Sequence, residues 1–491
     1  MRRIKASVIL LVVLACAVRA LVIFNFDNKP GDSVAHVENA ISILENHRSL
    51  HFDANVSVLY RYFLAAILYL WNNPLFSPRI FTALFGAFLI VPFYFLIKML
   101  FNERIAFYAN LVLVFYPLHA LQSGNTTSDV VFYFFFFSSL YYFFKFKHVK
   151  KRLSILILSA ILFNIAALLR FESWLFIPLL SFLLFRDSKK YATIFFFSSI
   201  VCPCLWLYLC YSITKDPFYS FVTAYKAAHA EILVRIPHNK QILGWLNVLY
   251  KNIGYNIVLC GLCGMVFAFF KKRSLHLALF FLLLFLLYTL NSLLSRMWYN
   301  ERYSIILGLL ILPYSVLFIE ALTSFFKIKP VILFLPFTLL CLLEFNKIIR
   351  SPNFYMPSIG ISLPQEVKDI AAWLKKNVSS TENIILSSDR YDMYIPDIVI
   401  RSGISPRRTL EVYTQISGVN TMTKGRIMEY IFNDKPRYLV LFYDSYLQQI
   451  INFDSKQKEI NKPGLIFKLV YKTYIINCGS AYIYEIIYNS A

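Results

Sequence analysis

Cysteine is scarce in this sequence, and the few cysteines are poorly placed for cross-links. Seven of the eight lie in apolar segments and only Cys478 lies outside them, so the pattern excludes a disulfide framework. Cys260 and Cys263 form a Cys-x-x-Cys pair, but it stands inside a hydrophobic run without a second pair. A zinc site therefore finds little support there.

Acidic residues are also scarce, while apolar residues dominate. The 491 residues include 27 Asp and Glu against 49 Lys and Arg, which gives a formal net charge of +22, and 58% of the chain is hydrophobic. No soluble core uses so much apolar surface, so the composition indicates an integral membrane protein. Most of the excess positive charge falls in short clusters between apolar runs. This is typical of membrane topology and of contact with anionic membrane lipids, and it argues against a nucleic-acid partner.

Long apolar runs predict about eleven transmembrane helices. The run over 6–24, after a basic start, fits either a cleaved signal peptide or an uncleaved first span, and the lack of a small-residue cleavage site favours the span. Arg19 near its far end would then snorkel to the outer surface. The other predicted spans cover 79–100, 105–121, 130–144, 153–169, 174–185, 191–213, 246–270, 275–294, 304–326 and 331–345.

The basic clusters predict the orientation of these spans. With this set of spans, five clusters fall on the side of the N-terminus, at 98–104, 145–152, 186–190, 271–273 and 327–329. Because positive loops stay inside, we expect a multi-pass protein of the plasma (inner) membrane with a cytoplasmic N-terminus. The C-terminal region is then extracytoplasmic. The short apolar stretch 56–71, interrupted by Arg61, is expected to be an interfacial or re-entrant helix.

The chain divides by composition into a membrane domain over 1–345 and a soluble α/β domain over 346–491. Apolar residues at helical spacing predict one helix around 367–374, and strands are expected at 384–386, 438–442, 466–471 and 481–487. The soluble domain carries no repeat, low-complexity tract, phosphate-binding glycine loop or recognisable catalytic triad. The distinctive polar residues lie instead in the predicted outer segments of the membrane domain.

The outer loop 25–73 carries the most informative stretch, residues 29–40. Pro30-Gly31 signals a turn, and Asp32 stands where a helix would begin. Asp32 and His36 lie one turn apart and are predicted to share the polar face of that helix, with Glu38 nearby. A carboxylate fixed at a membrane surface suits a transferase that uses a lipid-borne substrate. The alternative is that Asp32 only caps the helix.

Three further polar groups lie at the outer mouths of predicted spans. Asp129 precedes a span and either caps it or supplies a second carboxylate for acid/base work or for holding a cation. Arg170 and Glu172 end an outward span, as a snorkelling pair or as a phosphate-binding group. Arg302 and Tyr303 open another span, as ordinary interface residues or as a second phosphate-binding group.

The long outer loop 214–245 begins with Asp216-Pro217 and includes His229, Glu231 and His238. It either covers a substrate or is a plain solvated loop. The two histidines and the glutamate do not have a recognised metal spacing.

Taken in order, these segments resemble the C-type (GT-C fold) membrane glycosyltransferases, in particular the protein O-mannosyltransferases (glycosyltransferase family 39) and the lipid A aminoarabinose transferase. The matching features run from residue 19 to about residue 321. They are Arg19, Gly31-Asp32-Ser33 with Ala40, Arg79, Pro117, Asp129, Leu169-Arg170-Phe171-Glu172-Ser173-Trp174, Asp216-Pro217, and Arg302-Tyr303 with Pro313.

The resemblance implies transfer of a sugar from a polyprenyl-phosphate donor to a lipid, glycan or protein acceptor at the outer face, with inversion. By that analogy Asp32 is the general base for the acceptor hydroxyl. Arg170 and Arg302 stabilise the leaving lipid phosphate. Asp129 orients the acceptor or assists a divalent cation, whose presence the sequence leaves unknown. Tyr303, His36, Glu38, Glu172, Arg79 and Asp216 support these groups.

Two rival functions remain at this stage. A transporter or lipid flippase would place ionisable residues near the membrane midplane and would show internal repeats. A ligase or polymerase of lipid-linked glycans would share the topology but differ in its outer loops. Charges inside the predicted spans are few, and the polar residues gather at one face. The sequence therefore favours the transferase.

Overall fold

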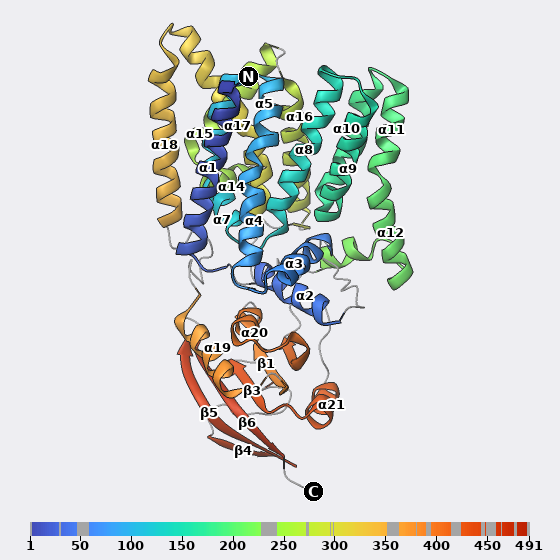
Figure 1. Ribbon diagram of the computed structural model, residues 1–491, viewed down its shortest axis with the longest axis vertical. Coiled ribbons are helices and arrows are strands. Elements are labelled where there is room, and N and C mark those ends of the chain that lie inside the picture. The colour runs from blue at the N-terminus through green and yellow to red at the C-terminus, as the bar shows by residue number, and fades with distance from the viewer. Residues whose placement is uncertain are drawn as a thin grey trace. The chain divides into compact units, whose positions relative to one another are not determined.

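The computed structural model describes residues 2–28, 31–46, 58–226, 243–271, 274–294, 296–297, 299–350, 363–379, 381–388, 394–413, 424–442, 447, 458–462, 464–475 and 479–488. Its contacts divide the chain into two compact units (Figure 1). The membrane unit comprises Met1–Asn25, Phe52–Tyr60 and Arg79–Phe354. The tail unit comprises Phe26–His51, Arg61–Pro78 and Tyr355–Ala491. Most of the outer loop 25–73, which includes Asp32, thus groups with the tail.

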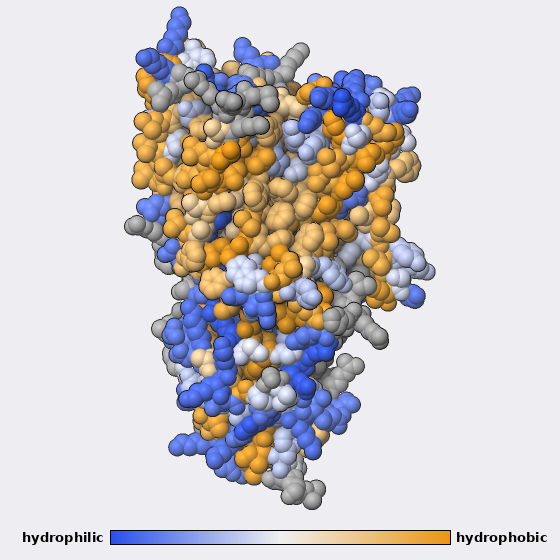
Figure 2. Space-filling view, in the orientation of Figure 1, coloured by the Kyte–Doolittle hydropathy of each residue, from blue (hydrophilic) through white to orange (hydrophobic). Residues whose placement is uncertain are grey.

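The membrane unit is built of helices, and each predicted span is helical. In chain order the helices are α1 (Arg2–Asn25), α4 (Ser77–Phe88), α5 (Ile90–Leu100), α6 (Glu103–Val114), α7 (Pro117–Ser123), α8 (Ser128–His148), α9 (Leu153–Leu169), η1 (Phe171–Leu175), α10 (Phe176–Phe185), α11 (Lys189–Ser199), α12 (Val201–Thr214), α14 (Gly244–Ile253), α15 (Tyr255–Phe270), α16 (Leu275–Leu293), η2 (Glu301–Tyr303), α17 (Ser304–Phe325) and α18 (Pro330–Arg350). Hydrophobic side chains dominate the surface over these helices (Figure 2).

Within the described residues, six helices are long and apolar enough to span a membrane, and the bent pair α6–α7 makes a seventh. The segments 153–169, 171–185 and 255–270 form shorter apolar helices. The predicted span 246–270 is interrupted at Gly254, whose φ of 100° ends α14 and starts α15. Because an L-residue rarely adopts this φ, glycine is the residue suited to the break.

The break between α6 and α7 corrects the prediction for Arg19. The two helices meet at 61°, with Pro117 at the start of α7. The guanidinium of Arg19 donates to the carbonyl of Val114 at 2.9 Å and contacts Nδ1 of His119 at 2.9 Å. Arg19 is therefore buried against the break and does not snorkel to the surface. It satisfies a helix-terminal carbonyl that the bend leaves without an intrahelical donor.

Contacts join several of the loops that carry basic clusters. Lys147 pairs with Asp187 at 2.6 Å, and the ring centroids of His148 and His276 lie 6.1 Å apart. The hydroxyl of Ser274 donates to the carbonyl of Leu100. These contacts bring together loops that are far apart in the sequence.

The tail unit contains a mixed six-stranded sheet in the order β2-β1-β3-β6-β5-β4. The first three strands pair in parallel and the others are antiparallel. The strands are β1 (Ile384–Ser388), β2 (Thr409–Tyr413), β3 (Tyr438–Phe442), β4 (Glu459–Lys462), β5 (Leu465–Ile475) and β6 (Gly479–Tyr488). The helices of the unit are α2 (Asp32–Asn46), α19 (Gln365–Asn377), α20 (Ile395–Ser402), η4 (Pro406–Arg408) and α21 (Lys424–Asp434), and α3 (Val58–Leu70) begins in the membrane unit.

Helices cover both faces of this sheet. On one face Ile370 of α19 and Ile398 of α20 pack in a core with Val440 of β3. On the other face Ile427 and Ile431 of α21 join a second core. The predicted helix and four predicted strands are confirmed, whereas β2, β4, α20 and α21 are additional.

Candidate functional site

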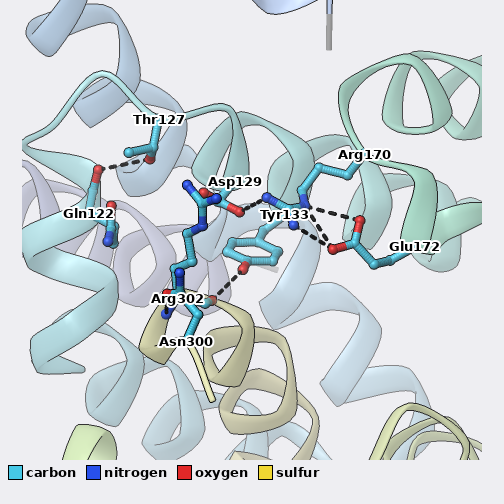
Figure 3. A network of polar contacts seen from close by, with 8 residues as sticks. All are labelled: Gln122, Thr127, Asp129, Tyr133, Arg170, Glu172, Asn300 and Arg302. Atoms are coloured by element: carbon cyan, nitrogen blue, oxygen red, sulfur yellow. Dashed lines mark hydrogen bonds and ion pairs between the residues drawn. The ribbon is translucent and has the colours of Figure 1, made fainter. Parts of the chain in front are cut away.

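A buried ion-pair cluster lies at one end of the membrane unit, centred on Arg170 (Figure 3). Its guanidinium bonds both oxygens of Glu172 through Nε, each at 3.1 Å, and pairs with Asp129 through Nη1. The side chains of Asp129, Arg170 and Glu172 are only 2%, 14% and 19% exposed. Two carboxylates thus share one guanidinium, and these three groups carry a net charge of −1.

Local structure explains why these three side chains converge. Asp129 lies in the first turn of α8, where a negative charge is favoured by the helix dipole. Arg170 follows the last residue of α9 in an extended conformation, with φ −156° and ψ 135°. The short helix η1 then begins, which places Glu172 beside the guanidinium. Glu172, which is close to Arg170 in the sequence, and Asp129, which is distant, therefore bind different edges of the planar guanidinium.

Aromatic rings line one side of the cluster. The guanidinium carbon of Arg170 lies 5.0 Å from the centroid of the Tyr303 ring, and that of Arg302 lies 5.4 Å from the same centroid. Tyr288 of α16 lies 6.1 Å from Tyr303, centroid to centroid. Both distances from guanidinium to ring are within cation–π range. Tyr303 therefore connects the two arginines for which the sequence predicts a phosphate-binding role.

Arg302 lies on η2, directly before α17. Its backbone is fixed by Asn300, whose side chain accepts from the Arg302 amide at 3.1 Å, and by Tyr133, whose hydroxyl donates to the Arg302 carbonyl at 3.3 Å. Asn252 of α14 supports the same turn through the hydroxyl of Ser304 at 2.8 Å. The Arg302 side chain points toward Asp129 (Figure 3).

The loop before α8 is held by Arg79 and by its own polar groups. Nε of Arg79 donates to the carbonyl of Gly124 at 2.7 Å, and Arg79 is buried. The hydroxyl of Thr127 donates to the carbonyl of Gln122 at 3.4 Å. Arg79 thus holds the loop that leads into Asp129.

Asp32, His36 and Glu38 all lie on α2, in the tail unit. The predicted helix start at Asp32 is confirmed, and its side chain is exposed. His36, however, is buried with Val37 and does not share the exposed face predicted for it. One turn of helix separates Asp32 from His36. The neighbours that pack on α2 decide the exposure of each, and the sequence spacing does not.

The remaining predicted group, Asp216, has a local role. Its Oδ1 accepts from the backbone N–H of Phe218 at 2.9 Å, which fixes the turn after α12. The helical segment that follows packs Phe221 against Phe171, with ring centroids 4.8 Å apart. The first residues of the long outer loop thus lie beside η1. His229, Glu231 and His238 fall outside the described residues.

Sequence reasoning missed Tyr133, Tyr288 and Asn300. They sit among aromatic and polar residues of apolar segments, where single side chains give no signal, and only packing brings them to the arginines. In the part of the chain that the structure describes, no three His, Cys, Asp or Glu side chains come together as metal ligands. Cys260 and Cys263 are free thiols on α15.

Comparison with known proteins places this arrangement in a class. Residues 55–209 match the family model described as dolichyl-phosphate-mannose-protein mannosyltransferase. The chain also resembles solved structures over nearly its whole length. ArnT from Cupriavidus metallidurans in the apo state superposes with a TM-score of 0.68 at 11% identity, covering 98% of each chain. The same protein bound to undecaprenyl phosphate gives a TM-score of 0.65 over 97% of each chain.

A third similar structure is the archaeal oligosaccharyltransferase AglB from Archaeoglobus fulgidus, in complex with an inhibitory peptide and a dolichol-phosphate. It gives a TM-score of 0.60 at 10% identity, covering 89% of this chain and 69% of AglB. Among curated proteins, none matches this sequence.

The fold is therefore that of the GT-C membrane glycosyltransferases: a polytopic helical membrane protein with a C-terminal α/β domain. The resemblance predicted from the sequence is confirmed at the level of the fold.

Proposed function

We propose that this protein is an inverting glycosyltransferase that moves a hexose or pentose from a polyprenyl-phosphate donor to an acceptor hydroxyl at the outer face of the membrane. The observation that carries the proposal is the likeness to ArnT over 98% of both chains, since a structure of that protein was solved with undecaprenyl phosphate. A fold alone does not establish an activity. The family match over 55–209 and the cluster of buried charges at one end of the membrane unit add support.

In the proposed reaction Asp32 is the general base. It takes the proton of the acceptor hydroxyl while the hydroxyl oxygen bonds to the anomeric carbon of the sugar. The bond from that carbon to the phosphate oxygen breaks on the opposite face, so the configuration inverts. The electron pair of that bond leaves with the lipid phosphate, which needs charge stabilisation more than a proton.

Arg302 is a candidate for binding the donor phosphate. The fork of Arg170 is already engaged by Asp129 and Glu172. A phosphate would have to compete with two carboxylates for it. Tyr303 lies against both guanidinium groups, so it would hold Arg302 in place as the lipid phosphate binds. In this proposal Arg170 mainly holds Asp129 and Glu172, and Asp129 orients the acceptor.

No step of this proposal runs through a divalent cation. Asp129 and Glu172 are the two carboxylates of the cluster, and each pairs with the guanidinium of Arg170. A cation at this place would have to displace Arg170. Activity that survives exhaustive chelation and dialysis would agree with the proposal, and loss of activity restored by one added divalent metal would contradict it.

The decisive experiment is a transfer assay in proteoliposomes with a polyprenyl-phosphate donor carrying a radiolabelled sugar and a panel of lipid, glycan and protein acceptors. Label moving to an acceptor hydroxyl with inverted configuration supports the proposal. Translocation of the donor lipid without transfer would identify a flippase. Label entering a growing lipid-linked glycan would identify a polymerase or ligase.

A further inference from the structure

The segment that carries Asp32 is tied to the tail domain at both of its ends, by contacts within the tail unit. Asp27, two residues after α1 ends, accepts from three donors. These are the amide of Leu363 at 3.3 Å, Nζ of Lys368 at 2.8 Å and Nη2 of Arg401 at 3.0 Å. One carboxylate thus gathers two cations and a backbone donor from the start of α19 and the end of α20.

The other end of the segment is held by a second, separate set of contacts. Glu45, in the last turn of α2, accepts from the hydroxyl of Ser405 at 2.7 Å and pairs with Nε of Arg407 at 3.9 Å. Arg407 also donates to the backbone carbonyl of Glu45. A carbonyl in the last turn of a helix has no intrahelical donor, so this contact caps α2 with a residue of η4.

Between these two ends α2 packs directly on α20 and η4. Val34, Val37 and Ala40 are buried along the helix, whereas Asp32 stays exposed in its first turn. Isolated surface ion pairs stabilise little, but these contacts combine three donors on one carboxylate with packing between them. The helix therefore sits on the tail domain as part of it.

We infer that Arg401 and Arg407 are positioning residues for the reaction: they clasp the two ends of the 27–45 segment and so set the place and direction of Asp32. The inference rests on the proposed function, in which Asp32 is the base. It gives the tail domain a task in catalysis that does not depend on the identity of the acceptor. A tail that only selected acceptors would leave α2 unchanged when these arginines are altered.

The test uses charge reversal at the Glu45 end in the full-length protein. Arg407→Glu and Glu45→Arg each put like charges together, and the double variant restores an opposite pair. Arg408→Glu is the matched control, since Arg408 lies next in the chain and donates to Asn383 at 3.3 Å. We expect each single variant to lower kcat about tenfold with the KM for the donor unchanged. The double variant restores the ion pair but neither the bond to the Glu45 carbonyl nor that from Ser405, so it should regain part of the loss. Arg408→Glu should behave as wild type.

Hydrogen exchange of α2 in the same proteins shows whether these contacts hold the helix, and it needs no activity assay. Residues 32–46 should exchange faster in the single variants and regain part of their protection in the double variant, with the strands of the tail unchanged throughout. Unchanged exchange in the single variants, or released α2 with wild-type kcat, would overturn the inference. If no sugar transfer is found in the wild type, the proposed function fails, while the exchange measurement still decides whether the clasp exists.

Discussion

Arg170 and Asp129 form an ion pair across 41 positions of sequence, with Asp129 almost completely buried. The pair joins the end of α9 to the first turn of α8. Glu172 occupies the other edge of the same guanidinium. The positive charge of Arg170 is thus balanced by two carboxylates inside the protein.

Removing Arg170 should destabilise the membrane unit more than it weakens donor binding. Arg170→Ala removes the guanidinium that pairs with both buried carboxylates, a loss of about 3 kcal/mol or more. The measurement is thermal inactivation of the purified protein in nanodiscs, with Arg186→Ala, an exposed arginine, as the control. Combining Arg170→Met with Asp129→Asn and Glu172→Gln should recover much of the loss. A wild-type melting curve for Arg170→Ala would show that the cluster contributes nothing.

Asp32→Asn should leave the protein folded and nearly inactive, because the amide cannot accept the acceptor proton. General bases contribute about 10²–10⁴-fold to rate, so the expected loss of kcat is at least a hundredfold. Asp369→Asn, at another acid of the tail unit, serves as the control. More than about a tenth of wild-type turnover in Asp32→Asn would be incompatible with a general base at this position.

Arg302→Lys should bind the lipid phosphate poorly, and Arg302→Ala should bind it worse. Lysine keeps the charge but cannot present two parallel N–H donors to a phosphate or stack on Tyr303 as a planar group. Titration of the detergent-solubilised protein with undecaprenyl phosphate measures this directly. Arg104→Lys, at the exposed Arg104 beside the basic clusters, is the control. Wild-type affinity in both Arg302 variants would leave Arg302 as an ordinary interface residue.

The tail unit should become less stable as the pH rises from about 4 to about 7. Burial raises the pKa of Asp397 to about 7, with the neighbouring Asp27 charge adding to the effect and Arg401 opposing it. The folded state therefore holds a proton in this window that the unfolded state, with an ordinary carboxyl, has released. The free energy of unfolding of the tail therefore falls by about 1.4 kcal/mol per pH unit in this window.

Asp397→Asn, which resembles the protonated acid, should remove that slope and stabilise the tail at pH 8. Pulse proteolysis of the full-length protein in urea, at pH 5 to 8, gives the midpoints. Asp27 has the opposite effect on the stability of the tail, and it acts in a lower pH range. Burial alone would raise its pKa, but Lys368 and Arg401 outweigh burial and lower it, so its contribution is complete above about pH 4 and is lost below it. If the stability of the tail fell equally with pH in wild type and in Asp397→Asn, the titration of Asp397 would be ruled out as the cause.

The tail should be accessible only from outside the cell. In a Cys478→Ser background, Lys375→Cys on the exposed face of α19 should react with an impermeant thiol reagent added outside. Lys190→Cys, in a predicted inner loop, should react only after the membrane is opened. The reverse pattern would invert the topology and move the proposed chemistry to the cytoplasmic face. Cys478 itself lies outside the described residues.

The sequence by itself determined the class of the protein and most of its helices. An apolar segment in a membrane must satisfy its own backbone hydrogen bonds, so long apolar runs become helices whatever surrounds them. The same local logic predicted the helix at Asp32, the helix of α19 and four strands of the tail, because period and turn residues act over a few positions. Arg170 and Glu172 are also close for a local reason, because they are only two positions apart in the sequence.

Only the tertiary structure decided which charges meet. Arg19 bonds the carbonyl of Val114, 95 positions away, at a bend in what the sequence predicts as one straight span. Asp27 accepts a hydrogen bond from Arg401, which lies 374 positions away in the sequence. Periodicity assigns a residue to a face of its own helix, but the helix that packs on that face is chosen by the fold as a whole. The burial of His36, the clasp on α2 and the pairing of Arg170 with Asp129 therefore had no local signal, because each depends on a partner supplied by another element.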